Sequence, residues 1–328
     1  MRVAILGTGN MGQVHAAAYS KIPDVKLFGM VGRKLGKTEK VARQFGARAF
    51  TDLDKVLNDE SIDAVDVCYP TFLHRKYVIA ALQRGKHVFC ETPIVFTLED
   101  AKAMVEAAKS SGRILMVALV MRFVAEYKHI HDTVISGKLG KPLSVYYYKI
   151  HPPYWLKDKP GCREHYAEPV IEIMNFQFDY LNWLFGLPNV VLAKGEKGKS
   201  GNFEHIFASL EFDNFLGMVE ASAKVPEDFT GTQDVRIICE KGVLETTTRF
   251  ISKGPIESAL MFYPKGERQK EIKVREYDPY EAECEYFVRC VQGNADPELL
   301  SPECAQDALR VSLATRDSLQ QDKPVAIR

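Results

Sequence analysis

The chain has 328 residues, which is enough for two domains with cores of their own. Its 43 basic and 43 acidic residues balance, so a global charge bias toward nucleic acid or an anionic membrane is excluded. No apolar stretch approaches the ~20 residues that span a bilayer. The seven cysteines show no C-x-x-C spacing, so neither a disulfide framework nor a metal site is expected. We therefore expect a cytoplasmic protein without a signal peptide, a nucleic-acid partner or a membrane partner.

The first predicted element is an apolar strand, Val3–Leu6, followed directly by G-x-G-x-x-G. The first glycine permits a tight turn, the second lets a pyrophosphate approach the backbone, and the third lets a helix pack against the strand. The alternative is an ordinary glycine turn between strand and helix. Because a strand precedes the motif and a helical pattern follows it, we favour the dinucleotide interpretation. The predicted contacts are Gly7, Thr8, Gly9, Asn10, Met11 and Gly12.

Strand and helix patterns alternate through the first third of the chain, which predicts a doubly wound parallel sheet with helices on both faces. Gly46, Gly85 and Gly112 each follow a helix, as C-terminal caps do. The predicted strands after the first are Lys26–Val31, Ala64–Val67, His87–Cys90 and Ile114–Val117. The predicted helices are Met11–Lys21, Thr38–Phe45, Leu73–Arg84 and Leu98–Ser110.

From about Leu143 the pattern changes to short β-rich runs, with hairpin signals at Asp213-Asn214 and Lys241-Gly242. This predicts an α+β domain with an open, largely antiparallel sheet. We place the nucleotide-binding domain at 1–120 and the domain for substrate binding and oligomerisation at 121–328. The predicted strands are Ser144–Ile150, His205–Phe212, Phe215–Ala221, Val235–Cys239 and Val243–Thr247, and the predicted helices are Val170–Phe185, Tyr280–Val291 and Pro302–Gln320.

The end of the second strand indicates which dinucleotide binds. An acidic residue about 20 positions after the glycines would bind the ribose 2′-hydroxyl of NAD. Here the strand ends in Gly32, Arg33 and Lys34, with no carboxylate. Gly32 is expected to leave room and the two basic residues to attract a 2′-phosphate, so NADP is predicted ahead of NAD. The alternative is that Arg33 stacks on adenine or faces water.

Several motifs together resemble the glucose–fructose oxidoreductase/inositol dehydrogenase (Gfo/Idh/MocA) family. The resemblance extends over essentially the whole chain, and it rests on the glycine motif with His15-Ala16, Pro70-Thr-Phe-Leu-His74, Ala80–Val88, Glu91-Thr92-Pro93, Met121-Arg-Phe123 with Tyr127, and Gly137–Pro142. It implies a Rossmann domain, a second α/β domain whose open sheet forms oligomers, and hydride transfer between a nicotinamide and a hydroxyl or carbonyl carbon. It therefore implies a homodimer or homotetramer that takes a small-molecule substrate, often sugar-like.

The chain departs from the family at the residues that transfer protons. The resemblance implies a lysine in E-K-P and an aspartate and a histidine in D-x-G-x-H. Thr92 stands in place of the lysine, Phe176 in place of the histidine, and Glu172 in place of the aspartate. Thr92 can hydrogen-bond an oxygen, but neither Thr92 nor Phe176 is a practical acid near neutral pH.

Replacement acid–base groups are expected nearby. Glu172 is the best-placed candidate, because burial could raise its pKa into the working range. The segment from Lys149 to Tyr166 precedes the same helix, and the resemblance places it over the substrate. Each of its residues could equally belong to a solvated loop or pack on the sheet. The predicted catalytic residues are Glu172, Thr92, His165 and Tyr166.

Four further residues are predicted to contact the cofactor: Pro70, His74, Glu91 and Pro93. His74 is expected either to reach the nicotinamide side or to cap its helix. Glu91 is expected to contact a ribose hydroxyl, and Pro93 to make a rigid turn with a cis peptide. His15 is interpreted as a packed polar residue. His129 and His131 point to different faces of a helix, which argues against a metal there.

The leading hypothesis is an NAD(P)-dependent oxidoreductase, with NADP preferred, that reduces or oxidises a small carbonyl, hydroxyl or imine substrate with altered acid–base residues. Two alternatives stay open. One is a nucleotide-binding sensor or scaffold without turnover, and the other is an enzyme that uses bound cofactor without net redox. The departures at Thr92 and Phe176 motivate both alternatives.

Overall fold

The structure is a computed structural model that describes residues 1–152, 172–199, 201–251 and 256–327. Its contacts divide the chain into two compact units, each formed by two segments. Unit 1 comprises Met1–Phe123 and Tyr277–Gln306, and unit 2 comprises Val124–Glu276 and Asp307–Arg328. The chain thus returns to unit 1 late in the sequence. The functions assigned to the stretches 1–120 and 121–328 stay predictions.

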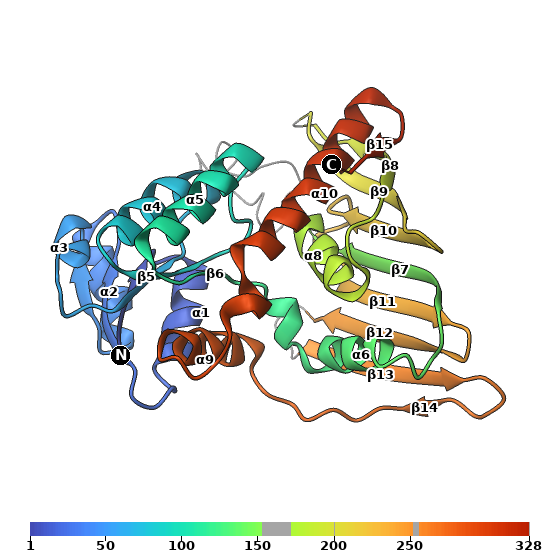
Figure 1. The fold of residues 1–328 in the computed structure, drawn as a ribbon, viewed down its shortest axis with the longest axis horizontal. Coiled ribbons are helices and arrows are strands. Elements are labelled where there is room, and N and C mark those ends of the chain that lie inside the picture. Colours follow the sequence, from blue (N-terminus) through green and yellow to red (C-terminus); the bar gives the residue numbers. More distant parts are fainter. Residues whose placement is uncertain (153–171, 200, 252–255, 328) are drawn as a thin grey trace. The chain divides into compact units, whose positions relative to one another are not determined.

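Unit 1 is built on a six-stranded parallel sheet, drawn in blue and teal in Figure 1. The strand order is β3-β2-β1-β4-β5-β6, so the chain adds strands on one side of β1 and then, from β4 on, on its other side. Sheets of this type bind ligands at this switch point, between β1 and β4, beyond the carboxyl ends of the strands. Apart from β3, whose residues are exposed or half-buried, the strands are short and largely buried runs. They are β1 (Arg2–Leu6), β2 (Lys26–Val31), β3 (Arg48–Phe50), β4 (Ala64–Val67), β5 (His87–Cys90) and β6 (Leu115–Val117).

Two helices of unit 1 have side-chain N-caps, and three glycines with positive φ follow helices. Thr97 caps α5 through a bond from the Asp100 amide, and Asp278 caps α9. Gly46, Gly85 and Gly112 have φ of 66°, 73° and 64°, which confirms their predicted role after helices. The helices are α1 (Asn10–Tyr19), α2 (Leu35–Gln44), α3 (Asp54–Leu57), α4 (His74–Gln83), α5 (Leu98–Ser111) and α9 (Pro279–Val291), with the short η1 (Thr71–Leu73), η2 (Val120–Phe123) and η4 (Pro297–Leu300).

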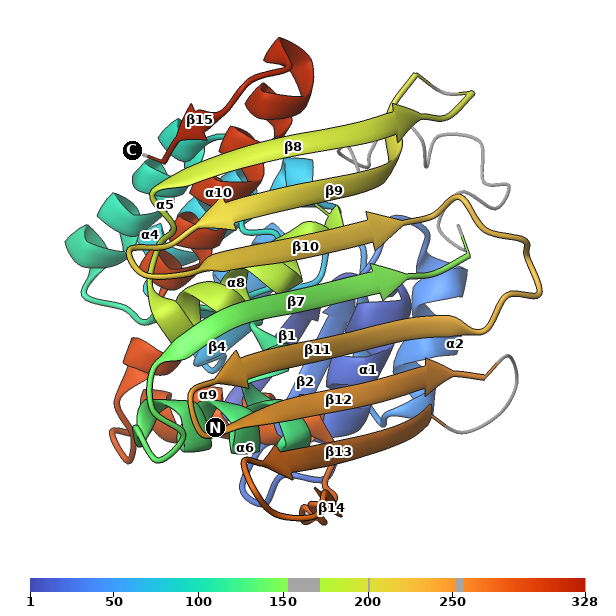
Figure 2. The same cartoon turned by 90° about the vertical axis from the view of Figure 1, so that its right-hand side faces the viewer.

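Unit 2 is built on a nine-stranded sheet of order β14-β13-β12-β11-β7-β10-β9-β8-β15. All neighbours are antiparallel except β7 and β10, which confirms the predicted, largely antiparallel sheet. One face of the sheet turns toward the viewer in Figure 2. The strands are β7 (Pro142–Ile150), β8 (Val190–Lys197), β9 (Phe203–Glu211), β10 (Leu216–Ser222), β11 (Gly231–Cys239), β12 (Gly242–Phe250), β13 (Ile256–Pro264), β14 (Lys270–Glu271) and β15 (Val325–Ala326).

Among the residues that the structure describes, helices cover only the other face of this sheet. They are α6 (Ala125–Ile135), α8 (Met174–Phe185) and the unit 2 part of α10 (Pro302–Gln321). On α8, the Gln177 side chain donates to the backbone carbonyls of Tyr147 and Glu220, at 3.1 Å each. Ser318 of α10 accepts the Ala193 amide at 2.9 Å. These bonds fix the helices over specific strands, so the sheet has one covered face and one open face.

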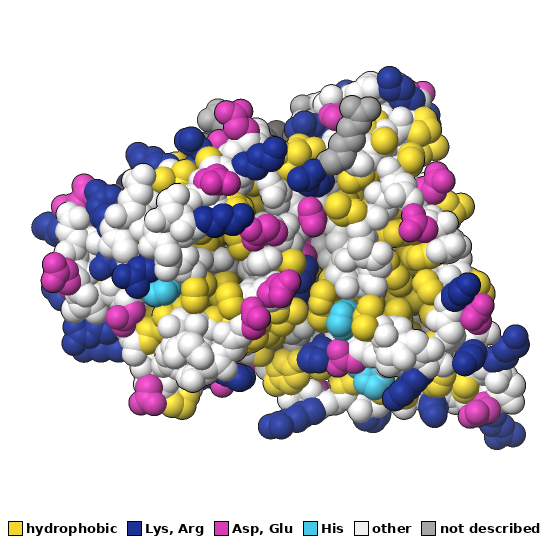
Figure 3. Space-filling model, in the orientation of Figure 1, with side chains coloured by type: hydrophobic (Ala, Val, Ile, Leu, Met, Phe, Trp, Pro, Cys, Tyr) yellow, Lys and Arg dark blue, Asp and Glu magenta, His cyan; other side chains and the backbone are white. Residues whose placement is uncertain are grey.

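The elements expected from the sequence are present, with ends shifted by a few residues. Strands β3, β8, β13, β14 and β15 and helix α3 were not predicted. Most of them lie at or near a sheet edge, where alternation and apolar content are weaker. Charged side chains of both signs mix over the face seen in Figure 3, as the balanced composition implies. Within the described part of the chain, no helix combines the length and apolar character needed to cross a bilayer.

Candidate functional site

The three glycines of the first turn have different surroundings. Gly7 has a φ of +136°, and a Cβ on it would lie 2.5 Å from the carbonyl oxygen of Cys68. A Cβ on Gly12 would lie 2.5 Å from the carbonyl oxygen of Gly7. A Cβ on Gly9 would meet no protein atom within 4 Å. Gly7 and Gly12 therefore serve close packing of β1, β4 and α1, whereas Gly9 leaves its backbone open to a ligand.

The amino terminus of α1 is suited to an anion. Gly9 is its N-cap, no side chain caps it, and no acidic residue lies in its first turn. The first amides of any helix lack carbonyl partners within the helix, so those of Asn10, Met11 and Gly12 are available to a diphosphate. The open position at Gly9 and this uncapped helix fit a dinucleotide, which supplies a hydride donor or acceptor when bound.

The end of β2 is exposed and basic, with one difference from expectation. Arg33 and Lys34 are exposed, and Lys34 is the N-cap of α2. Gly32 was expected to leave room for a phosphate. Instead, a Cβ there would lie 2.3 Å from Thr38 Oγ1 and 3.2 Å from the Thr8 side chain. Glycine is required here because two threonines pack over it, and the contact of Arg33 and Lys34 with a 2′-phosphate stays a prediction.

Loops at the carboxyl ends of β4 and β5 are joined through His74. This buried side chain has Nε2 2.8 Å from the carbonyl oxygen of Tyr69, and Nδ1 3.0 and 3.1 Å from those of Pro93 and Ile94. Burial lowers the pKa of His74, although these carbonyls oppose the shift. Both ring nitrogens face backbone, so these contacts favour a structural role over cofactor binding. Pro70, just before η1, and the cis Thr92-Pro93 peptide, which was predicted, flank this connection.

A cluster of buried charged groups lies beneath the glycine turn, and the sequence did not predict it. His15 of α1 is fully buried, with Nδ1 2.8 Å from Asp66 Oδ2 of β4. On the other side of the ring, Nε2 lies 3.1 Å from Glu91 Oε1 and 3.9 Å from Glu283 Oε1 of α9. The ring also stacks on Phe89. One imidazole therefore connects two helices with the ends of two strands.

Glu91 is turned into this cluster rather than outward. Its Oε1 faces His15, and its Oε2 accepts the backbone amide of Thr92 at 3.0 Å. Its predicted contact with a ribose hydroxyl is therefore not favoured by the geometry. The carboxylate instead fixes the residue that stands in place of the family lysine.

Protonation of the cluster follows from its charges. Burial alone would lower the pKa of His15, but Asp66, Cys68 and Cys284 together outweigh it and raise that pKa well above its ordinary value. Burial raises the pKa of Glu283 well above its ordinary range, with the nearby Glu91 and Asp66 adding to the shift and His15 opposing it. Both Glu283 oxygens lack a hydrogen-bond partner among the described residues. Both shifts favour the protonated forms, a charged imidazole at His15 and a neutral carboxyl group at Glu283.

His15, Asp66 and Cys284 also offer a nitrogen, an oxygen and a sulfur atom within 4.8 Å of one another. Such a set can ligate a metal, a possibility that residue spacing did not indicate because the three lie on different elements. Nδ1 lies 2.8 Å from the Asp66 carboxylate, so this nitrogen and this oxygen already pair with each other. We therefore treat the cluster as a proton-holding group. The sequence signal that could have indicated this buried cluster is Asp66, a carboxylate within an apolar strand.

In unit 2, the predicted acid–base residues lie at the start of α8. His165 and Tyr166 lie outside the described residues. Glu172 is half-buried and comes just before α8, and Phe176 is half-buried on its first turns. The Phe176 ring has Lys149 Nζ of β7 at 5.1 Å from its centre. The structure thus adds Lys149 to the candidates at this position, a residue that the sequence analysis named only as part of a segment.

The fold and the nucleotide site define the class of protein, an NAD(P)-binding oxidoreductase with a Rossmann sheet. Residues 1–119 match the family described as "Oxidoreductase family, NAD-binding Rossmann fold". These 119 residues match the Gfo/Idh/MocA family, and the likeness of the full chain to inositol dehydrogenases agrees with that match. It is 25% identical over 346 residues to myo-inositol 2-dehydrogenase of Thermotoga maritima, covering 100% of this chain and 98% of that one. It is 28% identical over 352 residues to scyllo-inositol 2-dehydrogenase (NAD(+)) of Bacillus subtilis, covering 100% and 96%.

A solved structure shows the same fold at low sequence identity. It is the aldose–aldose oxidoreductase of Caulobacter crescentus, with a TM-score of 0.88, 21% identity and 99% of each chain covered. The fold class and the enzyme class expected from the sequence are therefore confirmed.

Proposed function

We propose that the protein is an oxidoreductase that prefers NADP and acts on a hydroxyl or carbonyl carbon of a small polyol or sugar-like molecule. The observation that carries the cofactor preference is the end of β2, where Arg33 and Lys34 are exposed and no carboxylate is present. The relatives named as inositol dehydrogenases support the substrate class. Turnover of a panel of inositols, sugars and matching ketones, with NAD and NADP in turn, tests the whole proposal.

Arg33→Ser is expected to weaken NADPH binding by roughly 10- to 150-fold and to leave NADH binding nearly unchanged. The reason is that a hydrogen bond to a charged group contributes about 1.5–3 kcal/mol, and only NADPH has a 2′-phosphate to accept it. Titration of cofactor fluorescence with pure protein measures both dissociation constants. Lys40→Ser, which removes an exposed lysine from α2, is the matched control. Equal affinity of the unaltered protein for NADH and NADPH contradicts the preference.

Non-standard proton transfer is the second part of the proposal. The positions of the family lysine and histidine hold Thr92 and Phe176, so neither supplies an acid near neutral pH. Thr92 is held at its backbone amide by Glu91 and remains suited to hydrogen-bond a substrate oxygen. Glu172 precedes α8 in unit 2 and is a candidate base. Cofactor binding without turnover of any compound in the panel would favour the sensor or scaffold alternative.

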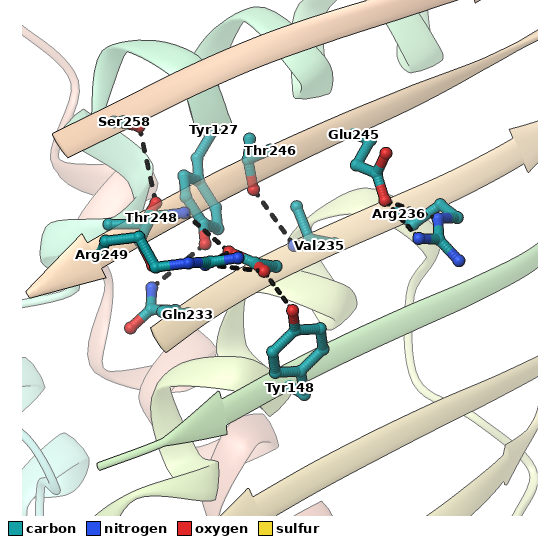
Figure 4. Close-up of polar contacts among 11 residues, drawn as sticks. Tyr127, Tyr148, Gln233, Val235, Arg236, Glu245, Thr246, Thr248, Arg249 and Ser258 are labelled. Atoms are coloured by element: carbon teal, nitrogen blue, oxygen red, sulfur yellow. Dashed lines mark hydrogen bonds and ion pairs between the residues drawn. The ribbon is translucent and has the colours of Figure 1, made fainter. Parts of the chain in front are cut away.

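We further propose that two or four copies associate through the open face of the unit 2 sheet. This face presents exposed Phe207, Leu216 and Met218 on β9 and β10. It also carries an ordered polar group, in which Asp234 accepts from the Tyr148 hydroxyl and from Arg249, the latter at 2.8 Å (Figure 4). Apolar side chains beside fixed polar groups are typical of a surface that another subunit covers.

The double change Leu216→Lys and Met218→Lys is expected to convert the assembly to monomers, because two charges would have to be buried in the contact. Sedimentation velocity measures the mass against the 37.0 kDa chain. Leu35→Lys replaces a similarly exposed leucine on α2 of unit 1 and should leave the assembly intact. A monomeric unaltered protein at micromolar concentration would refute this association.

A further inference from the structure

A half-buried lysine lies on the covered face of the unit 2 sheet, near the carboxyl end of the central strand β7. Lys149 is next to last in β7, and its register partners are Ala221 of β10 and Gln233 of β11. Neither partner carries a charge. Gln233 is itself engaged, since its Nε2 lies 3.2 Å from the Tyr127 hydroxyl and 3.0 Å from that of Tyr147. The two flanking strands therefore offer Lys149 no counter-ion.

The helix that packs over this region offers an aromatic ring instead. The Lys149 ammonium lies 5.1 Å from the centre of the Phe176 ring, within the range of a cation–π contact. Among the described residues, the amine makes no other ion pair or hydrogen bond. An amine that faces a ring rather than a carboxylate is stabilised weakly as a cation, so it can release a proton easily.

The pKa of this amine agrees with that geometry. Burial lowers the pKa of Lys149 to about 8, and no charged group offsets the shift. His151 directly follows the strand, and its pKa is lowered by burial and further by the Lys149 charge, although the Pro152 carbonyl opposes the shift. Asp179 is buried on α8 and Glu172 lies just before that helix, but neither carboxyl group contributes to the shift in the pKa of Lys149. A lysine that titrates near neutral pH is a common general acid or base, whereas an exposed one is not.

From this arrangement we propose that Lys149 is the proton-transferring group of the enzyme, in place of the acid–base residues missing at positions 92 and 176. In oxidation, the neutral amine takes the proton of the substrate hydroxyl while the carbon gives its hydride to the nicotinamide, so a carbonyl and an ammonium form. In reduction, the ammonium of Lys149 returns this proton to the alkoxide oxygen that develops as the carbonyl carbon accepts a hydride. The inference rests on the oxidoreductase function proposed above and deepens it.

The experiment compares Lys149→Met and Lys149→Arg with the unaltered protein on the inositol panel. Methionine keeps the apolar length of the side chain beside Phe176, and arginine keeps a charge that does not titrate. We expect kcat to fall roughly 100- to 10,000-fold in both variants, as loss of a general acid–base does. The dissociation constant of the dinucleotide should not change. Lys265→Met, at an exposed lysine after β13, is the matched control and should keep full activity.

The pH profile separates proton transfer from a structural role. The pH profile of kcat/KM for the unaltered protein should have a limb, a range in which kcat/KM changes steeply with pH, near pH 8. The residual activity of Lys149→Met should lack this limb. A variant that keeps both kcat and this limb overturns the assignment of Lys149 while leaving the proposed function intact. Absence of turnover by the unaltered protein on every compound overturns both.

A second measurement does not depend on activity. Competitive acetylation of the folded protein over pH 6–11, read by peptide mass spectrometry, reports the reactivity of each lysine. Lys149 should reach half of its maximal reactivity near pH 8, and the exposed Lys265 serves as the reference lysine. Identical curves for the two lysines contradict the proposal.

Discussion

His15→Phe is expected to destabilise the protein by about 3–5 kcal/mol at pH 7.5, measured by denaturant unfolding, because it breaks a buried ion pair by removing one partner. The new ring can still stack on Phe89, so the shape of the site is largely kept and the charge is lost. Asp66 and Glu91 then remain buried without the cation that faces them at 2.8 and 3.1 Å. Such a loss is a large part of the whole stability of a typical domain.

The directions of the pKa shifts determine how the stability of the protein changes with pH. The folded pKa of His15 is raised, so its contribution is fully present below about pH 6.5, its ordinary value, and is lost as pH rises through the folded pKa. The folded pKa of Glu283 is also raised, so the folded state keeps a proton that the unfolded state releases, and stability again falls with rising pH. The unaltered protein should therefore lose stability between about pH 6.5 and the alkaline range.

Glu283→Gln changes the same cluster, but it is expected to raise the stability of the protein rather than to lower it. The amide cannot ionise, so the cost of keeping Glu283 neutral at alkaline pH disappears. We expect this variant to be more stable than the unaltered protein at pH 9 and its stability to depend less steeply on pH. Equal stability of His15→Phe and the unaltered protein at pH 7.5, or a pH slope that Glu283→Gln leaves unchanged, would show that the cluster is not held together by charge.

The cofactor half of the molecule was largely predictable because its signals are local. Strand β1, the three glycines and helix α1 follow one another within the first 19 residues, and each glycine has a requirement that no other residue meets. Strands β2, β4 and β5 are short apolar runs bounded by turns, and the structure places them at the residues expected. Local patterns of this kind need no knowledge of distant contacts.

The residues that were missed or misjudged depend on long-range contacts. Glu91 was expected to face a ribose, but its orientation is set by His15, 76 positions earlier, and by the amide that follows it. Gly32 was expected to leave space, but Thr38 fills that space. Lys149 is significant because of Phe176 on α8, and no spacing rule connects a strand residue with a helix residue 27 positions later. In each case the role of the residue depends on the direction of a side chain, and local sequence patterns do not predict that direction.

Gly9→Ala is expected to abolish dinucleotide binding while leaving the stability of the protein unchanged. A Cβ on this residue would meet no protein atom within 4 Å, and its φ of −74° is one that alanine adopts freely. The added methyl group would instead occupy the space over which a diphosphate must approach the backbone. Cofactor titration and thermal unfolding of the same preparation measure the two effects separately.

Two other glycines complete this comparison. Gly12→Ala places a Cβ 2.5 Å from the Gly7 carbonyl, so α1 must move, and we expect a loss of about 1–3 kcal/mol in stability together with the loss of binding. Gly36→Ala in α2 meets nothing within 4 Å and should raise stability by about 0.5–1 kcal/mol with binding intact. If Gly9→Ala bound the dinucleotide as tightly as Gly36→Ala does, the open backbone at Gly9 would not be where the diphosphate lies. In that case the amino terminus of α1 would lose its assigned role.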